Sequence, residues 1–153
     1  MITRILLAVD DSPDSLAAAR VAVELAGRLR AELRAVHVRT NLAPAVAVET
    51  PASSPPDGRR TSAAAILAHV ATLAQTAEVD VQTEFLEGDV VPAVLDAAHA
   101  WHAQGVVVGK ATRSTTGSSY VGTQTRHLLE FADLPVLVIP HAPVEPTRYR
   151  TAG

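Results

Sequence analysis

A glycine-bounded loop rich in hydroxyl side chains is the part of this sequence best suited to bind an anion. Valines 106–108 form a buried-strand pattern that ends at Gly109, and the next helical pattern opens with Gly122 and Thr123. Between them lie several Ser and Thr residues and Lys110, the only lysine of the chain. Glycine lets a ligand approach the backbone, and a helix start offers unpaired N–H groups at a positive dipole end. We therefore predict that this loop binds phosphate.

A second polar strand end follows the first apolar run of the chain. Residues 5–9 are all apolar and are followed by Asp10, Asp11, Ser12 and Pro13. Ser12 is a favourable N-cap and Pro13 suits the first helical position, so a helix is predicted to begin here. Asp10 is predicted either to bind a ligand at the strand end or to cap this first turn. Asp11 is interpreted as a solvated partner of the helix dipole.

The other polar residues do not form an arrangement typical of an enzyme active site. The sequence has no Ser-His-Asp order, no suitably spaced pair of carboxylates, and no lysine–serine pair after glycines. It contains no cysteine, which excludes disulfides and thiolate metal sites. His99 and His102 lie three residues apart without a third ligand nearby, so we interpret them as an exposed helix face. His37, inside a predicted strand, is interpreted as a core or rim residue.

Length and charge set broad limits on fold and partners. The chain has 153 residues, of which 48% are hydrophobic, and this is enough for one domain with a core. Its net charge of −3 gives no electrostatic reason to expect nucleic acid or an anionic membrane as a partner. The first apolar run is too short for a signal peptide or a membrane span, so we expect a cytoplasmic protein.

Short apolar runs alternate with helical patterns along the chain. Strands are predicted at residues 4–9, 32–39, 79–87, 105–109 and 134–140. The helices are expected to bury Ala17, Val21, Leu25 and Leu29, then Ile66, Val70 and Leu73 within 61–77, then Val91, Val94, Leu95 and Ala98, with a fourth helix at 122–132. Residues 41–60 are predicted to form a mobile connection or lid. Residues 142–153 are expected to be a flexible tail after a domain of residues 1–141.

This alternation predicts a single-domain α/β fold with an open five-stranded parallel sheet, order 3-2-1-4-5, and helices on both faces. Open sheets of this kind bind ligands where the strand order reverses. Asp10 and Gly109 would then meet at one crevice. The last strand, Leu134 to Ile139, is nearly all apolar and would lie at an edge. Because an exposed apolar edge invites pairing, we predict a homodimer through this strand.

These segments together resemble the universal stress protein family, from Arg4 to Pro140. The resemblance is carried by residues 7–12 with Ser15, by residues 36–38 and 86–89, by the glycine loop, and by the apolar last strand that ends in proline. Nucleotide-binding members carry a glycine, two residues, a second glycine, nine residues, and a glycine followed by Ser or Thr. Gly109, Gly122 and Thr123 are in register with that pattern, whereas Thr112 replaces the second glycine.

The resemblance implies an adenine nucleotide α-hydrolase-like fold that binds ATP, with or without Mg²⁺. Asp10 would meet the adenine–ribose end, and Val38 would lie beside the base, mainly through its backbone. Gly109 would let the chain approach the phosphates, which the start of the following helix would hold. The binding residues expected on this basis are Ala8, Val9, Asp10, Val38, Val108, Gly109, Lys110, Thr112, Arg113, Gly122, Thr123, Gln124 and Thr125.

Thr112 leaves two functions open. The first is an ATP-binding, dimeric, nucleotide-dependent switch in the stress response, with at most slow ATP hydrolysis. The second is a protein of the same fold that has lost nucleotide binding and acts through protein contacts. Lys110 and Arg113 flank Thr112 and either supply charge-assisted bonds to phosphate or point into solvent.

Overall fold

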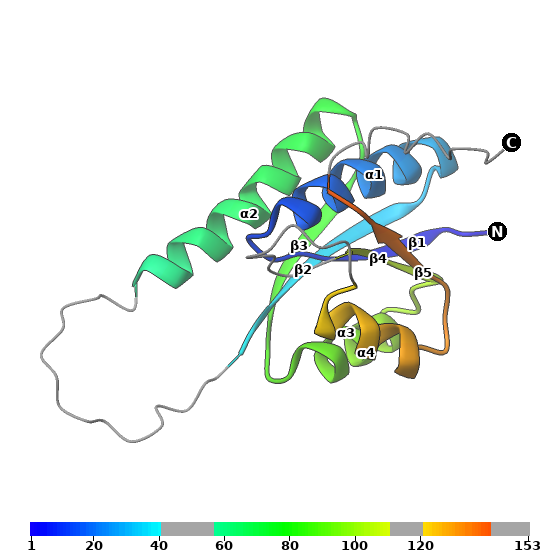
Figure 1. Cartoon of the computed structure of the whole chain (residues 1–153). Helices are drawn as coiled ribbons and strands as arrows, with labels where there is room; N and C mark the ends of the chain where they lie inside the picture. Colours follow the sequence, from blue (N-terminus) through cyan, green and yellow to red (C-terminus); the bar gives the residue numbers. More distant parts are fainter. Residues whose placement is uncertain (41–56, 111–120, 142–153) are drawn as a thin grey trace, which may run out of the picture.

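The computed structural model describes residues 1–40, 57–110 and 121–141, and its centre is one parallel sheet. The strand order is β3-β2-β1-β4-β5, as predicted, and all four pairings are parallel. Helices α1 and α2 cover one face of the sheet, and α3 and α4 cover the other (Figure 1). The elements are β1 (Arg4–Ala8), α1 (Pro13–Leu29), β2 (Glu32–Arg39), α2 (Asp57–Thr76), β3 (Val81–Glu87), α3 (Val90–Ala100), β4 (Gly105–Gly109), α4 (Thr123–Phe131) and β5 (Val136–Ile139).

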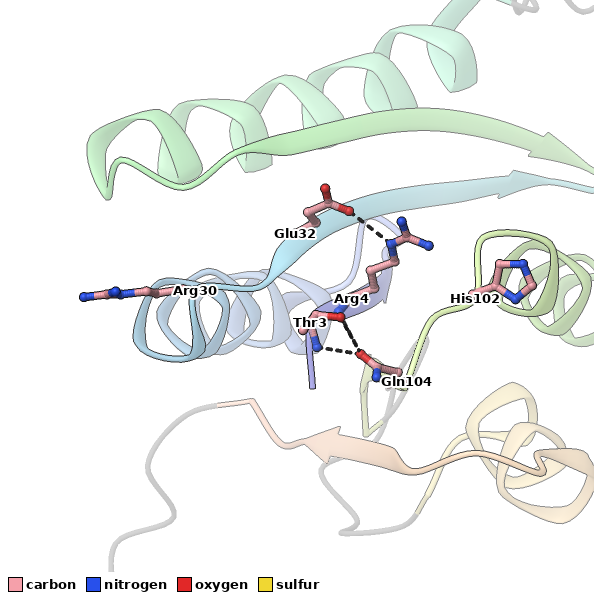
Figure 2. Close-up of a pocket in the computed structure, with 6 residues that line it drawn as sticks. All are labelled: Thr3, Arg4, Arg30, Glu32, His102 and Gln104. Atoms are coloured by element: carbon pink, nitrogen blue, oxygen red, sulfur yellow. Dashed lines mark hydrogen bonds and ion pairs between the residues drawn. The ribbon is translucent and has the colours of Figure 1, made fainter. Parts of the chain in front are cut away.

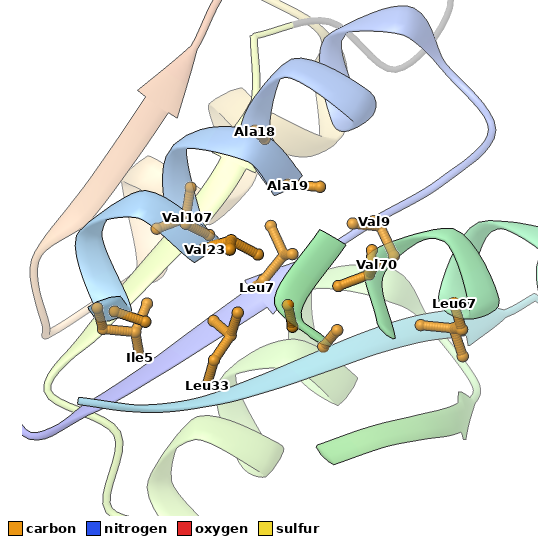
Figure 3. Close-up of a cluster of buried hydrophobic side chains, with 14 of the residues drawn as sticks. Ile5, Leu7, Val9, Ala18, Ala19, Val23, Leu33, Leu67, Val70 and Val107 are labelled. Carbon is orange, nitrogen blue, oxygen red and sulfur yellow. The ribbon is translucent and has the colours of Figure 1, made fainter. Parts of the chain in front are cut away.

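The two central strands fill both cores because successive side chains point to opposite faces. Leu7 and Val107 belong to the cluster under α1 and α2, which Figure 3 shows. Leu6 and Val106 belong to the cluster under α3 and α4. Burial of β1 and β4 on both faces explains why their sequences are continuous apolar runs rather than alternating ones. No helix in the described part of the chain is long and apolar enough to cross a bilayer.

Helix α1 begins where it was predicted but buries a different face. Of the residues expected in the core, Ala17, Val21 and Leu25 are half-buried, and Leu29 is 42% exposed. The face that packs on the sheet is formed by smaller side chains, namely Ser15, Ala18, Ala19, Ala22, Val23 and Ala26. Small residues let the helix axis come close to the strands. The spacing of the bulkier residues therefore indicated the wrong face.

The other elements agree with the predicted ones to within a few residues. Helix α2 begins at Asp57, so residues 57–60 are helical and not part of a connection. These four residues carry no apolar side chain, and hydrophobic periodicity could not reveal them. The core positions of α2 and α3 were predicted correctly, with Leu73 and Leu95 only half-buried. The predicted lid, apart from residues 57–60, and the predicted tail lie outside the described residues.

Gly109, the last residue of β4, marks the closest approach of α1 to the sheet. A β-carbon built there would lie 2.8 Å from the carbonyl carbon of Asp14 and 2.9 Å from the backbone nitrogen of Ser15. Real β-carbons essentially never come within 3.0 Å of such atoms. The first turn of α1 therefore requires glycine at this position, independently of any ligand.

Replacing Gly109 with alanine should destabilise the fold by about 1–3 kcal/mol, because overpacking must push α1 away from β4. The matched control is Gly105→Ala in the same strand, where the new β-carbon would meet only the Pro135 carbonyl oxygen at 3.7 Å. Urea unfolding of both variants measures the difference. Equal stabilities would show that the first turn of α1 is not tightly packed on β4.

An ion pair links α3 to the end of α4. His99 Nε2 lies 2.7 Å from Asp133 Oδ1, and the hydrogen bond from His99 lowers the pKa of the Asp133 carboxyl below 3.8. A carboxylate with a lowered folded-state pKa contributes stability above its unfolded pKa and loses it as pH falls through the folded pKa.

Asp133→Asn should therefore lower the melting temperature slightly near neutral pH, since both partners are exposed. The gap from the wild type should close as the pH falls below 3.8. Thermal melts from pH 3 to pH 7 check this, and His99→Ala should remove the same pH-dependent part. A gap that persists unchanged in acid would contradict it.

Candidate functional site

The carboxyl ends of β1 and β4 lie side by side at the centre of the sheet. Leu7 of β1 pairs with Val107 of β4, so the chain segments after these residues begin at the same edge. The order of strands reverses here, and α1 and α4 leave toward opposite faces (Figure 1). Open α/β sheets bind ligands at such a switch point. The predicted meeting of the two polar strand ends is present in the structure.

Asp10 is held by the first turn of α1. Its Oδ1 accepts hydrogen bonds from the Ser12 backbone N–H at 2.8 Å and from the Ser15 hydroxyl at 2.9 Å. The Ser15 hydroxyl oxygen in turn accepts from the Asp10 backbone N–H at 2.9 Å. Ser12 caps the helix as predicted, because its hydroxyl oxygen accepts from the Ser15 N–H at 3.2 Å. The carboxylate therefore has a fixed position at the crevice and a structural role there.

The start of α4 is fastened to the end of β4 by two hydrogen bonds. The Gly122 N–H donates to the Lys110 carbonyl at 2.8 Å, and the buried Thr125 hydroxyl donates to the Gly109 carbonyl at 2.8 Å. The Lys110 N–H itself donates to Ile139 of β5 at 2.7 Å. The position of α4 thus depends on the sheet and not on the residues between Lys110 and Gly122.

The first turn of α4 presents backbone donors at the same edge. The first intrahelical bond runs from the Arg126 N–H to the Gly122 carbonyl at 2.9 Å, so the N–H groups of Thr123, Gln124 and Thr125 precede it. Gly122 is the N-cap, and no side-chain cap bond forms there. Three N–H groups and the helix dipole therefore point out of the helix start, the arrangement by which helices bind anions.

Several of the predicted ligand-binding residues can contribute only through their backbone. The side chain of Val9 is buried under α1 and α2, and that of Val108 is buried under α3 and α4. Ala8 and Val38 are half-buried and pack on the second of these clusters. The Thr125 hydroxyl hydrogen is used in holding α4.

The remaining predicted residues differ in exposure and in whether the structure describes them. The Thr123 side chain is exposed, and those of Lys110 and Gln124 are half-buried. Gly109 and Gly122 lie at the two ends of the loop and are buried. Thr112 and Arg113 lie outside the described residues.

Two residues at this edge were not predicted as site residues. Ser15 connects Asp10 to α1, and its only sequence signal was a serine five residues after the aspartate. His37 was interpreted as a core or rim residue, and it is half-buried with Nδ1 2.8 Å from the Val9 carbonyl oxygen. Its position is determined by the pairing of β2 with β1, which no local pattern specifies.

A separate pocket of about 440 Å³ lies at the opposite, amino-terminal edge of the sheet (Figure 2). Its polar groups already pair with one another: Arg4 with Glu32 at 3.1 Å, and the Thr3 hydroxyl with Gln104 at 3.0 Å. This pocket is not part of the crevice between β1 and β4. Among the described residues, no cluster of three or more His, Asp or Glu side chains forms a metal site.

Comparisons with known proteins agree with this architecture. The sequence profile of the universal stress protein family matches residues 1–140. A crystal structure from that family, from Burkholderia pseudomallei, is 26% identical over 91% of this chain and 96% of its own, with a TM-score of 0.70. No curated protein matches the sequence.

Two further solved structures that share the fold contain nucleotides. A universal stress protein in complex with cAMP is 21% identical over 92% of this chain and 98% of its own, with a TM-score of 0.68. The universal stress protein from Archaeoglobus fulgidus in complex with dAMP is 21% identical over 91% and 99%, with a TM-score of 0.63. Because the family profile covers nearly the whole chain, this protein belongs to the universal stress protein family.

Proposed function

We propose that this protein binds an adenine nucleotide, with ATP as the leading ligand, in the crevice between β1 and β4, and acts as a dimeric nucleotide-dependent switch. The observation that carries the proposal is the glycine-capped start of α4, held beside Asp10 at the switch point of the sheet. Two relatives of the same fold are bound to cAMP and dAMP, which supports the choice of an adenine nucleotide.

The residues of the crevice suit the parts of such a ligand. The N–H groups of Thr123, Gln124 and Thr125 would donate to phosphate oxygens. Asp10, fixed by Ser12 and Ser15 through Oδ1, would receive the adenine–ribose end. A magnesium ion bound with ATP would need only one or two protein carboxylates besides the phosphates. No residue of the crevice has a geometry that supplies a general base, so we propose binding and not rapid hydrolysis.

One sequence feature favours a second function. Thr112 stands where nucleotide-binding members carry glycine, and its β-carbon would lie close to a phosphate. The alternative is a stress protein of the same fold that does not bind nucleotide and acts through protein contacts.

The two functions are separated by the ligand content of the purified protein. If the nucleotide-binding proposal is correct, acid-denatured protein should release an adenine nucleotide, or its melting temperature should rise on addition of ATP. A ligand at 100 times its Kd stabilises the native state by about 2.7 kcal/mol. Titrations with and without Mg²⁺, with GTP as a control, measure this. Neither release nor a shift would leave the second function.

Lys110 and Arg113 test how the chain compensates for Thr112. Replacing both with alanine should weaken ATP binding by at least about tenfold and affect adenosine little, because charge-assisted bonds to phosphate are worth roughly 1.5–3 kcal/mol each. The control is Arg28→Ala with Arg30→Ala, which removes the same charge at the far end of α1. Isothermal titration calorimetry measures the affinities. Unchanged ATP affinity in the Lys110 and Arg113 double variant would exclude these side chains from the phosphate site.

We also propose that the protein forms a homodimer through β5. This strand lies at the edge of the sheet, and Leu137 is 43% exposed. The carbonyls of Pro135 and Ile139 accept from β4, so the backbone groups of Val136 and Val138 face away from it. Pairing with a second copy would satisfy these outward groups and cover the apolar side chains.

Val138→Pro should convert the dimer to a folded monomer, because proline removes an outward N–H and leaves the bonds to β4 in place. The matched control is Leu137→Pro, which removes an N–H directed at β4 and should destabilise the sheet itself. Light scattering at micromolar concentration gives the mass, and circular dichroism reports folding. A monomeric wild-type protein would contradict the dimer.

A further inference from the structure

The hydrogen-bond ladder between β1 and β2 ends in an unusual way at the crevice. The strands pair in register from Arg4 with Glu32 to Ala8 with Val36, and the Val9 N–H adds one more bond to the Val36 carbonyl at 2.9 Å. In a parallel ladder the next bond would run from the N–H two residues further along β2 to the carbonyl of Val9. That donor belongs to Val38.

The imidazole of His37 takes the place of this backbone donor. Its Nδ1 lies 2.8 Å from the Val9 carbonyl oxygen. Because a carbonyl only accepts, Nδ1 carries the hydrogen in this bond. Among the described residues, no backbone N–H donates to the Val9 carbonyl.

The ring of His37 reaches this carbonyl across the face of the sheet covered by α1 and α2. Leu33 and Ala35, at alternate positions of β2, belong to the cluster on that face, and His37 continues the alternation. The ring is also supported from β3, since it stands edge-on to Phe85 with centroids 6.3 Å apart and an interplanar angle of 87°. The bond to Val9 is thus made by a side chain that its neighbours hold in place.

The consequence concerns the backbone of Val38. The N–H of Glu32 donates to Thr3, and the carbonyl of Val36 accepts from Val9, so the even-numbered residues of β2 turn their N–H and carbonyl groups toward β1. Val38 continues this alternation. Both of its backbone polar groups therefore face the space beyond the end of β1, where the crevice begins.

We infer that His37 is a positioning residue that ends the β1–β2 ladder and keeps the Val38 N–H and carbonyl available to a ligand. One donor beside one acceptor matches the edge of adenine, which offers a ring nitrogen and an amino group. This inference rests on the proposed nucleotide binding for its ligand. The state of the Val38 amide, however, is a property of the protein alone.

The experiment is amide hydrogen exchange by NMR on the full chain without ligand. In the wild type, the Val38 amide should exchange much faster than that of Val36, which lies inside the ladder. In His37→Leu, the Val9 carbonyl loses its donor and should recruit the Val38 N–H, so Val38 protection should rise at least about tenfold. Adenosine monophosphate affinity should fall by about the same factor.

Two variants separate positioning from general stability. His37→Asn places an amide nitrogen near the position of Nδ1 and should keep the Val38 amide fast and restore affinity. Phe85→Leu removes the ring contact but leaves the donor, so it should change stability without protecting Val38. A Val38 amide as protected as Val36 in the wild type, or unchanged in His37→Leu, would overturn the inference. Fast exchange at Val38 in a wild type that binds no nucleotide would overturn the proposed function alone.

Discussion

The close packing of α1 against the end of β4 is the contact on which the rest of the crevice depends. Without a side chain at Gly109, the backbone of Asp14 and Ser15 can lie against the strand. Ser15 then bonds Asp10, and Asp10 bonds the N–H of Ser12. A single missing β-carbon therefore sets the position of the helix start and, through it, of the carboxylate at the mouth of the crevice.

Two helices begin near this edge, and their caps give them different chemistry. At α1 the serine and aspartate side chains use up donors of the first turn, since Ser12 accepts from Ser15 and Asp10 accepts from Ser12. At α4 the N-cap is Gly122, which has no side chain to accept a bond. An anion therefore finds satisfied donors and a carboxylate at α1 but open donors at α4. This asymmetry assigns phosphate to one side of the crevice and the base and sugar to the other.

The sequence predicted the sheet order and the crevice but not the contacts within them. Strand pattern and handedness rules are global constraints, so the meeting of the β1 and β4 ends followed from alternation alone. The buried face of α1 was predicted wrongly because its alanines carry no strong hydrophobic signal. The roles of Ser15 and His37 depend on how a helix turn and a neighbouring strand are placed, which no spacing along the chain records.

The two edges of the sheet differ in a way that favours one of them for self-association. The outer strand β3 exposes polar and acidic side chains, including Gln82, Glu84 and Glu87, and two copies of such an edge would bring like charges together. The described part of β5 carries only Val, Leu and Ile. Pairing through β5 would add no repulsion and would remove apolar surface from water. Because the Lys110 N–H binds Ile139, a second copy on β5 would also press on the strand that anchors the start of the glycine loop. Dimerisation and ligand binding would then act on one shared element.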